Sequence, residues 1–326
     1  KKFCGSAERN LSHPKDRFLK KGIIKMTQFH YEKVKDPLFF KENVLSAHSA
    51  HEIFRNREEA SVGRNSLRML LDGVWKFSYA LNQAAAPVGF EKEEYDCKCW
   101  ESICVPAHIQ MEGYDVPQYA NVQYPWDGRE ELEPGEIPVR FNPTASYVKY
   151  FEVPQEMKGK TIRISFQGVE SGMALWLNGS YVGYSEDSFT PSEFDLTPFL
   201  KEGENKLAVQ VYKWTSSSWC EDQDFFRFSG IYRSVYLYAV PSVHIEDIRV
   251  KTLFEEQDFD EAVLEVRTKA VGSGSIRYRL KDGEQVLFER EDKIVSGEQT
   301  ETVSIKNAPQ GSRLQEAVSG KKKKKI

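Results

Sequence analysis

The chain has 326 residues, a formal net charge of −4, 29% charged residues and 13% aromatic residues. This length suffices for two domains that each bury an apolar core. The slightly acidic balance offers no basic footprint, so we expect no nucleic-acid partner. No apolar run approaches the roughly 18 residues of a membrane-spanning helix, and the first residues lack the apolar segment of a secretory signal. These features predict a cytoplasmic protein without a membrane partner.

We expect residues 1–60 to form an N-terminal extension that precedes the strand-rich part of the chain. They contain two weakly helical phrases, at residues 37–43 and 48–56. Two interpretations stay open for this polar segment: it wraps the surface of the next domain, or it remains disordered.

Residues 61–241 carry the pattern of an antiparallel β-sandwich. In TIRISFQGV (161–169) and NKLAVQVYKW (205–214), apolar and polar residues alternate, which predicts strands with one buried face. Asn178-Gly179 lies between two apolar arms and predicts a tight hairpin. Short strands without a long amphipathic helix favour an all-β jelly-roll sandwich.

Three cysteines cluster just inside this segment, at Cys97, Cys99 and Cys104. Their spacing raises the question of zinc, but no second Cys or His pair follows at zinc-site spacing. Reduced thiols in a cytosolic protein are the better interpretation.

A second strand-rich segment, 242–309, follows Pro241. Ile276, Tyr278 and Leu280 alternate with basic residues, and Asp282-Gly283 supplies a tight turn. Three or four strands in this length suggest a smaller immunoglobulin-like sandwich that lacks its last strands. An incomplete sandwich would leave the three alternating apolar residues exposed to water.

Two irregular segments have the composition of recognition loops. They read VPAHIQMEGYDVPQYANVQYP at 105–125 and WCEDQDFFRFSGIYR at 219–233. Each combines aromatic rings, carboxylates or amides, and Gly or Pro. Polar groups walled by aromatic rings are what a sugar ligand needs, so these segments predict carbohydrate binding.

The phrases GYDVPQYANVQYP and EDQDFFRFSGIYR resemble the N-terminal part of the large bacterial β-galactosidases of glycoside hydrolase family 2. Further matching phrases follow in the same order, among them LDGVWKF (71–77) and WLNGSYVGYSEDSFTPSEFDLTPFL (176–200). The resemblance implies a galactose-binding-like jelly roll at 61–241 and a partial immunoglobulin-like domain at 242–309. It also implies a cytosolic, homo-oligomeric parent enzyme that hydrolyses β-galactosides such as lactose.

The two ends of the chain fall outside this resemblance, which runs from about residue 26 to 309. Residues 1–25 precede the first methionine, Met26, and are expected to be a translated leader or a fragment edge. The tail GSRLQEAVSGKKKKKI shows no strand alternation. We expect residues 310–326 to be a frameshifted or otherwise non-native reading, with a solvated basic tail as the alternative.

We do not expect this chain to carry the catalytic residues of the family. Retaining glycosidases need two carboxylates about 5 Å apart, and in this family both are glutamates of a later (β/α)8 barrel. The chain has no Asn-Glu dipeptide to match the acid/base, and its six histidines suggest no catalytic magnesium site. We assign no catalytic residue and predict a non-catalytic sugar-binding and scaffold part. A free-standing carbohydrate-binding module and an interaction module remain alternatives.

Two positions match sugar-binding residues of the family. Asn121 matches the asparagine that reaches into the galactose pocket, and Asp224 matches the aspartate that contacts the sugar and a sodium ion. An amide offers a donor and an acceptor to vicinal hydroxyls, and a carboxylate suits both hydroxyls and a hard cation. The plainer alternatives are an Asx-turn at Asn121 and a cap or an ion pair with Arg227 or Arg233 at Asp224.

Aromatic residues of the two segments are candidate pocket walls, since flat rings suit the apolar face of a pyranose. The alternative is that they belong to the sandwich core. The candidates are Tyr114, Tyr119, Trp126, Trp219, Phe225 and Phe226.

Overall fold

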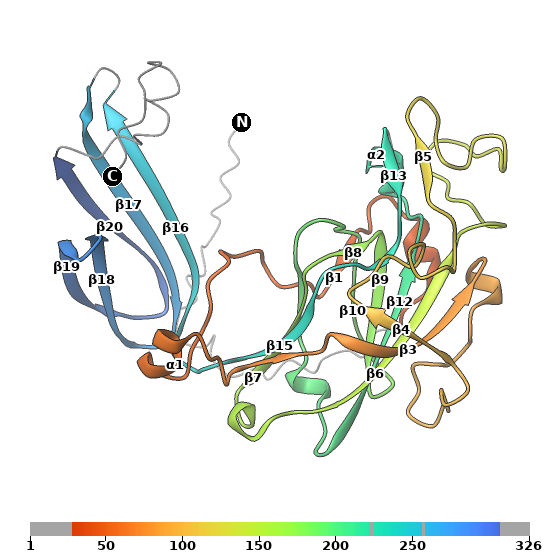
Figure 1. Ribbon diagram of the computed structural model, residues 1–326, viewed down its shortest axis with the longest axis horizontal. Helices are drawn as coiled ribbons and strands as arrows, with labels where there is room; N and C mark the ends of the chain where they lie inside the picture. The colour runs from red at the N-terminus through yellow and green to blue at the C-terminus, as the bar shows by residue number, and fades with distance from the viewer. Residues whose placement is uncertain (1–27, 222–223, 256–257, 307–326) are drawn as a thin grey trace, which may run out of the picture.

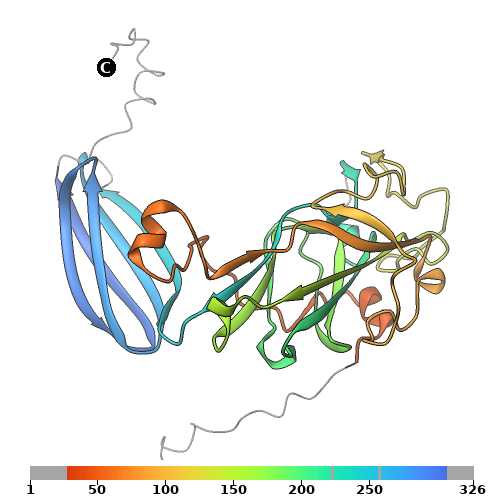
Figure 2. The same cartoon turned by 60° about the horizontal axis from the view of Figure 1, so that its bottom comes forward.

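The computed structural model describes residues 28–221, 224–255 and 258–306, and nearly all of its regular elements are strands. The strands form a large sandwich and a smaller one, which lie end to end (Figures 1 and 2). This confirms the all-β prediction. None of the helices in the described part of the chain has the length and apolar character needed to cross a bilayer. The helical elements are η1 (Tyr31–Lys35), α1 (Arg57–Val62), η2 (Gln83–Ala85), η3 (Gln155–Met157), η4 (Thr197–Phe199) and α2 (Ser218–Glu221).

The large sandwich packs a seven-stranded sheet against a four-stranded sheet. All neighbouring strands within both sheets are antiparallel. The first sheet has the order β1 (Lys41–Glu42), β10 (Ser180–Ser185), β9 (Gly172–Leu177), β12 (Glu204–Tyr212), β6 (Thr144–Glu152), β3 (Gly73–Ala80) and β4 (Glu101–Val105). The second has the order β11 (Ser192–Asp195), β7 (Thr161–Phe166), β15 (Val235–Val240) and β2 (Arg68–Leu70).

Two short ribbons extend this sandwich, and the remaining five strands form the smaller one. The ribbons are β5 (Gln118–Ala120) with β13 (Phe225–Arg227), and β8 (Val169–Glu170) with β14 (Gly230–Ile231). The smaller sandwich pairs a sheet of β16 (His244–Glu255), β17 (Asp258–Val271) and β20 (Gly297–Lys306) with a hairpin of β18 (Gly274–Asp282) and β19 (Gln285–Ile294).

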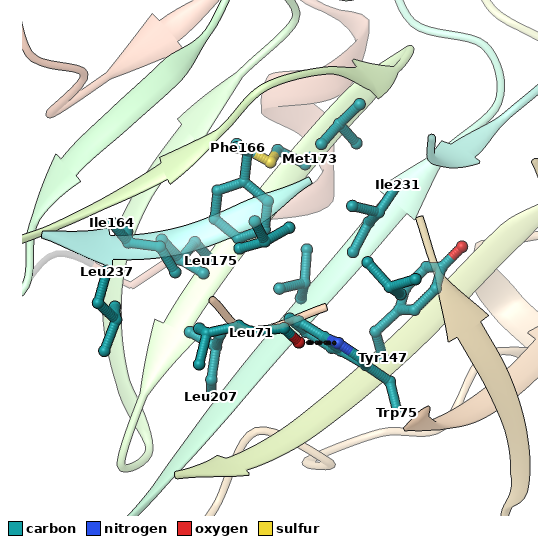
Figure 3. Close-up of a cluster of buried hydrophobic side chains, with 14 of the residues drawn as sticks. Leu71, Trp75, Tyr147, Ile164, Phe166, Met173, Leu175, Leu207, Ile231 and Leu237 are labelled. Atoms are coloured by element: carbon teal, nitrogen blue, oxygen red, sulfur yellow. Dashed lines mark hydrogen bonds between the residues drawn. The ribbon is translucent and has the colours of Figure 1, made fainter. Parts of the chain in front are cut away.

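The core of the large sandwich lies between its two sheets (Figure 3). The apolar half of the alternation predicted for β7 is confirmed, because Ile162, Ile164 and Phe166 are all buried there. On the other face of this strand, Arg163 is partly exposed but Ser165 is buried as well. The polar atom of the buried Trp75 is satisfied locally, since its Nε1 donates to the carbonyl oxygen of Leu71 at 2.9 Å. The Trp75 ring is therefore buried with its indole donor satisfied.

The prediction of one buried face for β12 is wrong, because both faces are buried. Leu207 and Val209 face the second sheet, as expected. On the other face, Ala208 and Tyr212 join a second apolar cluster. The polar residues of that face are accommodated too, since Lys206 Nζ donates to the carbonyl oxygens of residues 92 and 95 at 2.6 and 2.9 Å.

The described part of the N-terminal extension covers this second face. Val34 is fully buried, and the ring of Phe29 lies 5.7 Å from that of Trp176 and 5.5 Å from that of Tyr184. Of the two interpretations, wrapping is therefore correct. The helical phrases at 37–43 and 48–56 do not form helices: the first is a turn that leads into β1, the second has no regular element, and α1 begins after them at Arg57.

Both predicted tight turns are present. Asn178 and Gly179 join β9 to β10 with φ angles of 51° and 77°, the left-handed conformation that a two-residue hairpin requires. The second turn lies one residue later than predicted, because Asp282 still pairs with Gln285 as the last residue of β18. Gly283, with a φ of 55°, and Glu284 form this turn.

The expectation that the alternating apolar residues of β18 stay in water is wrong for Ile276, whereas Tyr278 and Leu280 keep partial exposure. Ile276 is only 9% exposed and packs with Ala270 and Ile294, with Tyr278 against them. The hairpin β18–β19 covers one face of the three-stranded sheet, so these side chains point into the space between the two sheets. The alternation itself is confirmed, since Arg277 and Arg279 between them are exposed.

We expect Phe29→Ala to destabilise the large sandwich by about 2 kcal/mol, because it removes the ring that covers the outer face of the seven-stranded sheet. Urea unfolding followed by tryptophan fluorescence measures this, since the six tryptophans, Trp75 to Trp219, all lie in that sandwich. The matched control is Phe40→Ala, at a ring that is 54% exposed; its change should stay within about 0.5 kcal/mol. Equal effects of the two variants would contradict the covering role.

Candidate functional site

The two recognition segments lie side by side. The backbone N–H groups of Ala107 and Ile109 donate to the carbonyl oxygens of Ile231 and Ser229, each at 2.9 Å. Farther along, Tyr124 Oη donates to the carbonyl oxygen of residue 219 at 3.1 Å. Backbone pairing thus joins two segments that are about a hundred residues apart in the sequence.

Strands β5 and β13 bring the two predicted sugar-binding residues together. Ala120 pairs with Phe225 and Tyr119 with Phe226. Continuing this antiparallel register by one residue places Asn121 opposite Asp224. Both residues are exposed, and the ribbon lies at the end of the large sandwich that is remote from the smaller one (Figure 1).

Asp224 is held in an unusual conformation. Its φ is 54°, in the left-handed region that few residues other than glycine adopt. Its Oδ1 accepts a hydrogen bond from Tyr119 Oη at 2.5 Å, and this bond raises the pKa of the Tyr119 phenol. Backbone strain that is kept at an exposed carboxylate is typical of functional positions.

The side chain of Asn121 bonds to its own loop, but not as the Asx-turn of the plainer interpretation, because it accepts the N–H of the next residue and not that of the residue two positions on. Its Oδ1 accepts the backbone N–H of Val122 at 2.7 Å, which fixes the side chain against its own loop. An amide oxygen has two lone pairs, and the amide nitrogen has two donors. The local bond therefore orients the side chain and leaves hydrogen-bonding capacity for a ligand.

The candidate wall residues divide into an exposed and a buried set. Tyr119, Phe225 and Phe226 are exposed on the ribbon, and the rings of Tyr119 and Phe226 are 5.1 Å apart. Trp126 is only 2% exposed, and Tyr114 packs against the main core, so both serve the fold. Trp219 lies between these extremes, with its ring 5.1 Å from that of Trp126.

A buried ion pair that sequence reasoning missed anchors the first segment. Lys213 Nζ lies 2.5 Å from Asp115 Oδ2, and the two side chains are 2% and 3% exposed. Gln110 connects this pair to the second segment, because its Nε2 donates to Asp115 Oδ2 and to Ser229 Oγ, both at 2.9 Å. The sequence signalled this ion pair only by Lys213 itself, a lysine near the end of the predicted strand NKLAVQVYKW (205–214).

Glu186 is a second buried carboxylate that the sequence did not indicate. It is 3% exposed and accepts hydrogen bonds from Tyr184 Oη at 2.6 Å and Thr215 Oγ1 at 2.9 Å. Burial raises its pKa above the usual value for a glutamate. These bonds fix the start of the 214–220 loop, which leads into Asp224.

No three His, Cys, Asp or Glu side chains converge to form a metal-binding group within the residues that the structure describes. Of the cysteines first considered for zinc, Cys97 is buried, whereas Cys99 and Cys104 are exposed. The oxygen atoms at the end of the β5–β13 ribbon are those of Asp224, Tyr119 and Asn121. They are hard donors of the kind that an alkali or alkaline-earth cation accepts.

Comparison with known proteins identifies the larger sandwich. Residues 68–241 match the family described as "Glycosyl hydrolases family 2, sugar binding domain". A β-galactosidase of Halalkalibacterium halodurans is 47% identical over 276 residues, which is 83% of this chain and 27% of that protein. One of Streptococcus thermophilus is 44% identical over 287 residues, 87% of this chain and 28% of that protein. The chain thus spans little more than a quarter of the length of these relatives.

Solved structures share the fold at lower identity. A β-glycosidase from Bacteroides vulgatus has a TM-score of 0.55 and 23% identity, covering 74% of this chain and 29% of that one. A β-glucuronidase from Bifidobacterium dentium has a TM-score of 0.54 and 21% identity, covering 75% and 43%. These likenesses concern the arrangement of the sandwiches.

We expect Asp115→Ala to cost about 3 kcal/mol of stability, because it leaves the ammonium group of Lys213 buried without its carboxylate. The double variant Asp115→Ala/Lys213→Met should recover much of the loss. The matched control is Glu93→Ala, which breaks the exposed pair of Glu93 with Lys201 and should cost less than about 1 kcal/mol. Urea unfolding of the four proteins measures these differences. Equal losses in the single and double variants would contradict the ion-pair argument.

Proposed function

The chain belongs to glycosyl hydrolase family 2, and from that premise we propose that it is the sugar-binding and scaffold part of a cytosolic β-galactosidase. The proposed substrate of the whole enzyme is a terminal β-D-galactoside such as lactose. The proposal rests on one observation above all: the register of the β5–β13 ribbon places Asn121 opposite Asp224 on an exposed edge.

The chemistry of that edge fits a sugar ring. The carboxylate of Asp224 accepts hydrogen bonds from two adjacent hydroxyls, and the amide of Asn121 both donates and accepts. The exposed rings of Tyr119 and Phe226 offer apolar faces beside them, which suits the C–H face of a pyranose. An open edge of this kind supplies one side of a pocket, and we propose that the rest of the enzyme supplies the other side.

Asp224 is also our proposed ligand for a sodium ion. Its carboxylate, with the nearby oxygens of Tyr119 and Asn121, forms a partial set of hard donors. A bound sodium ion would supply positive charge that orients the sugar hydroxyls. We propose no magnesium site in this chain.

We propose no catalysis by this chain alone. Glycoside hydrolysis with retention of configuration requires two carboxylates about 5 Å apart at the scissile bond. The family that matches this chain is described as a sugar-binding domain.

A chimera tests the sugar-binding role. The matching segment of the Halalkalibacterium halodurans β-galactosidase is replaced by this chain, and lactose hydrolysis is measured. In an active chimera, Asp224→Asn should lower kcat/KM by at least about tenfold and abolish stimulation by sodium, because a hydrogen bond to a charged group is worth about 1.5–3 kcal/mol. Asn121→Ala should lower kcat/KM without changing the sodium dependence.

The matched control is Glu112→Gln, which neutralises an exposed carboxylate of the first recognition segment. It should leave both the lactose kinetics and the sodium dependence unchanged. Unchanged kinetics in Asp224→Asn, or equal losses in Asp224→Asn and Glu112→Gln, would refute the assignment.

The isolated chain distinguishes the remaining alternatives. We expect no release of nitrophenol from a nitrophenyl β-galactoside, and no galactose binding by calorimetry at millimolar sugar, because one side of a pocket binds weakly. Turnover that survives removal of host enzymes would overturn the non-catalytic role. Saturable galactose binding that Asp224→Asn removes would favour a free-standing carbohydrate-binding module.

A further inference from the structure

A four-residue strap of the N-terminal extension, His48-Ser49-Ala50-His51, lies between the two sandwiches. In Figures 1 and 2 the extension leaves the large sandwich after β1 and runs to α1, which lies beside the smaller sandwich. The two histidine rings of the strap are in contact, with centroids 5.4 Å apart. The strap is therefore a candidate for controlling how the sandwiches are joined.

His48 attaches the strap to the large sandwich. Its Nε2 lies 2.8 Å from Glu193 Oε2 and its Nδ1 lies 2.8 Å from the carbonyl oxygen of Ser49. Both partners are acceptors, so only a ring that carries two protons satisfies both contacts. Glu193 is on β11 and also accepts a hydrogen bond from Tyr238 Oη at 2.6 Å.

The next residues attach the strap to the smaller sandwich. The backbone N–H of Ser49 donates to Asp247 Oδ1 at 2.8 Å, and Ser49 Oγ accepts the backbone N–H of Ile248 at 3.1 Å. His51 Nε2 lies 3.0 Å from the carbonyl oxygen of Ile245. Every one of these partners belongs to β16, so the strap bridges β11 and β16.

A second ionic bridge crosses the junction directly. Arg163 of β7 donates to both carboxylate oxygens of Glu246 of β16 at 3.2 Å. His244 Nε2 lies 2.8 Å from Glu246 Oε2 as well. Glu52 pairs with Arg68 at 2.7 Å on the outer side of the junction. These groups enclose a cavity of about 50 Å³ between the sandwiches, where charges interact more strongly than on an open surface.

We propose that this junction is a pH-sensitive lock, in which the protonated His48 ring holds the strap on Glu193 and thereby holds the smaller sandwich on the large one. Loss of the second ring proton removes the charge that pairs with Glu193 and one of the two donors. The strap then loses its charged attachment to β11, and the sandwiches remain joined by the Arg163–Glu246 bridge, the Glu52–Arg68 pair and the chain itself.

The direction of the pH effect follows from the His48 environment. The hydrogen bond to Glu193 raises the pKa of His48 from 6.5 to about 9, although burial opposes this. A raised pKa means that the protonated ring favours the docked strap. The contribution of His48 to docking of the strap is therefore complete below the ordinary pKa of histidine, and it is lost as the pH rises through about 9.

Three carboxylates, two tyrosines and one arginine of the junction keep their charge states across this range. Hydrogen bonds from His48 and Tyr238 outweigh burial and lower the pKa of Glu193. The pKa values of Glu246 and Asp247 are also lowered, by His244 and by the backbone N–H of Ser49. Burial raises the pKa of Tyr236 and Tyr238 above 10, and hydrogen bonds to Glu246 raise that of Arg163.

Amide hydrogen exchange of the full chain between pH 6 and 10 tests the lock. After correction for intrinsic exchange, protection at the Ser49 and Ile248 amides should fall on the order of tenfold, with a midpoint near the His48 pKa of about 9. Amides of β12 serve as the internal reference and should show no such step. His48→Asn, which cannot be protonated, should give low protection at every pH.

Two matched variants identify the titrating ring. His30→Asn changes an exposed histidine outside the junction, and His244→Asn changes the ring on the second bridge. Both variants should still show the fall in protection of the Ser49 and Ile248 amides near pH 9. The assignment to His48 would be overturned if the fall in amide protection near pH 9 remained in His48→Asn or disappeared in His244→Asn.

A second measurement does not depend on any variant. Nuclear magnetic resonance follows the His48 ring carbons and the strap amides in the unaltered chain. The two sets of signals should titrate together. Strap amides that keep their protection after the His48 ring has lost its proton would overturn the proposal, and so would a ring that loses its proton near pH 6.5.

Discussion

Burial of β12 on both faces is the constraint on which the rest of the large sandwich depends. A central strand with two apolar faces needs two covers. The four-stranded sheet covers one face, and Val34 and Phe29 of the extension help to cover the other. The extension is therefore an integral layer of the sandwich. The same strand leads directly to Lys213, so the apolar core positions the buried ion pair of the recognition loop.

The candidate sugar site is built from polar anchors beneath an exposed edge. Gln110, Asp115 and Lys213 fix the first segment from below, and Glu186 fixes the loop before the second. Buried charges are costly unless they are paired and hydrogen-bonded, and fully satisfied networks make a structure rigid. At the exposed edge itself, the Asp224 carboxylate is held by the hydrogen bond from Tyr119 Oη.

The N-terminal extension contributes at two places that lie far apart. Its first described residues close the outer face of the seven-stranded sheet, and its strap reaches the junction with the smaller sandwich. The first contact is mainly apolar, with the Lys33–Glu42 ion pair beside it, whereas the second is made of ions and hydrogen bonds.

The sequence by itself determined the elements that depend on neighbouring residues. The alternation in β7 and β18 gave strands, and Asn178-Gly179 and Asp282-Gly283 gave tight turns, because side-chain period and φ preference are local properties. Motif likeness singled out Asn121 and Asp224. Tertiary structure alone decided what covers each face: the second buried face of β12, the burial of Ile276, and the partners of Lys213, Glu186 and His48. Those outcomes depend on residues far away in the chain, and only the folded arrangement brings such residues within hydrogen-bonding or packing distance.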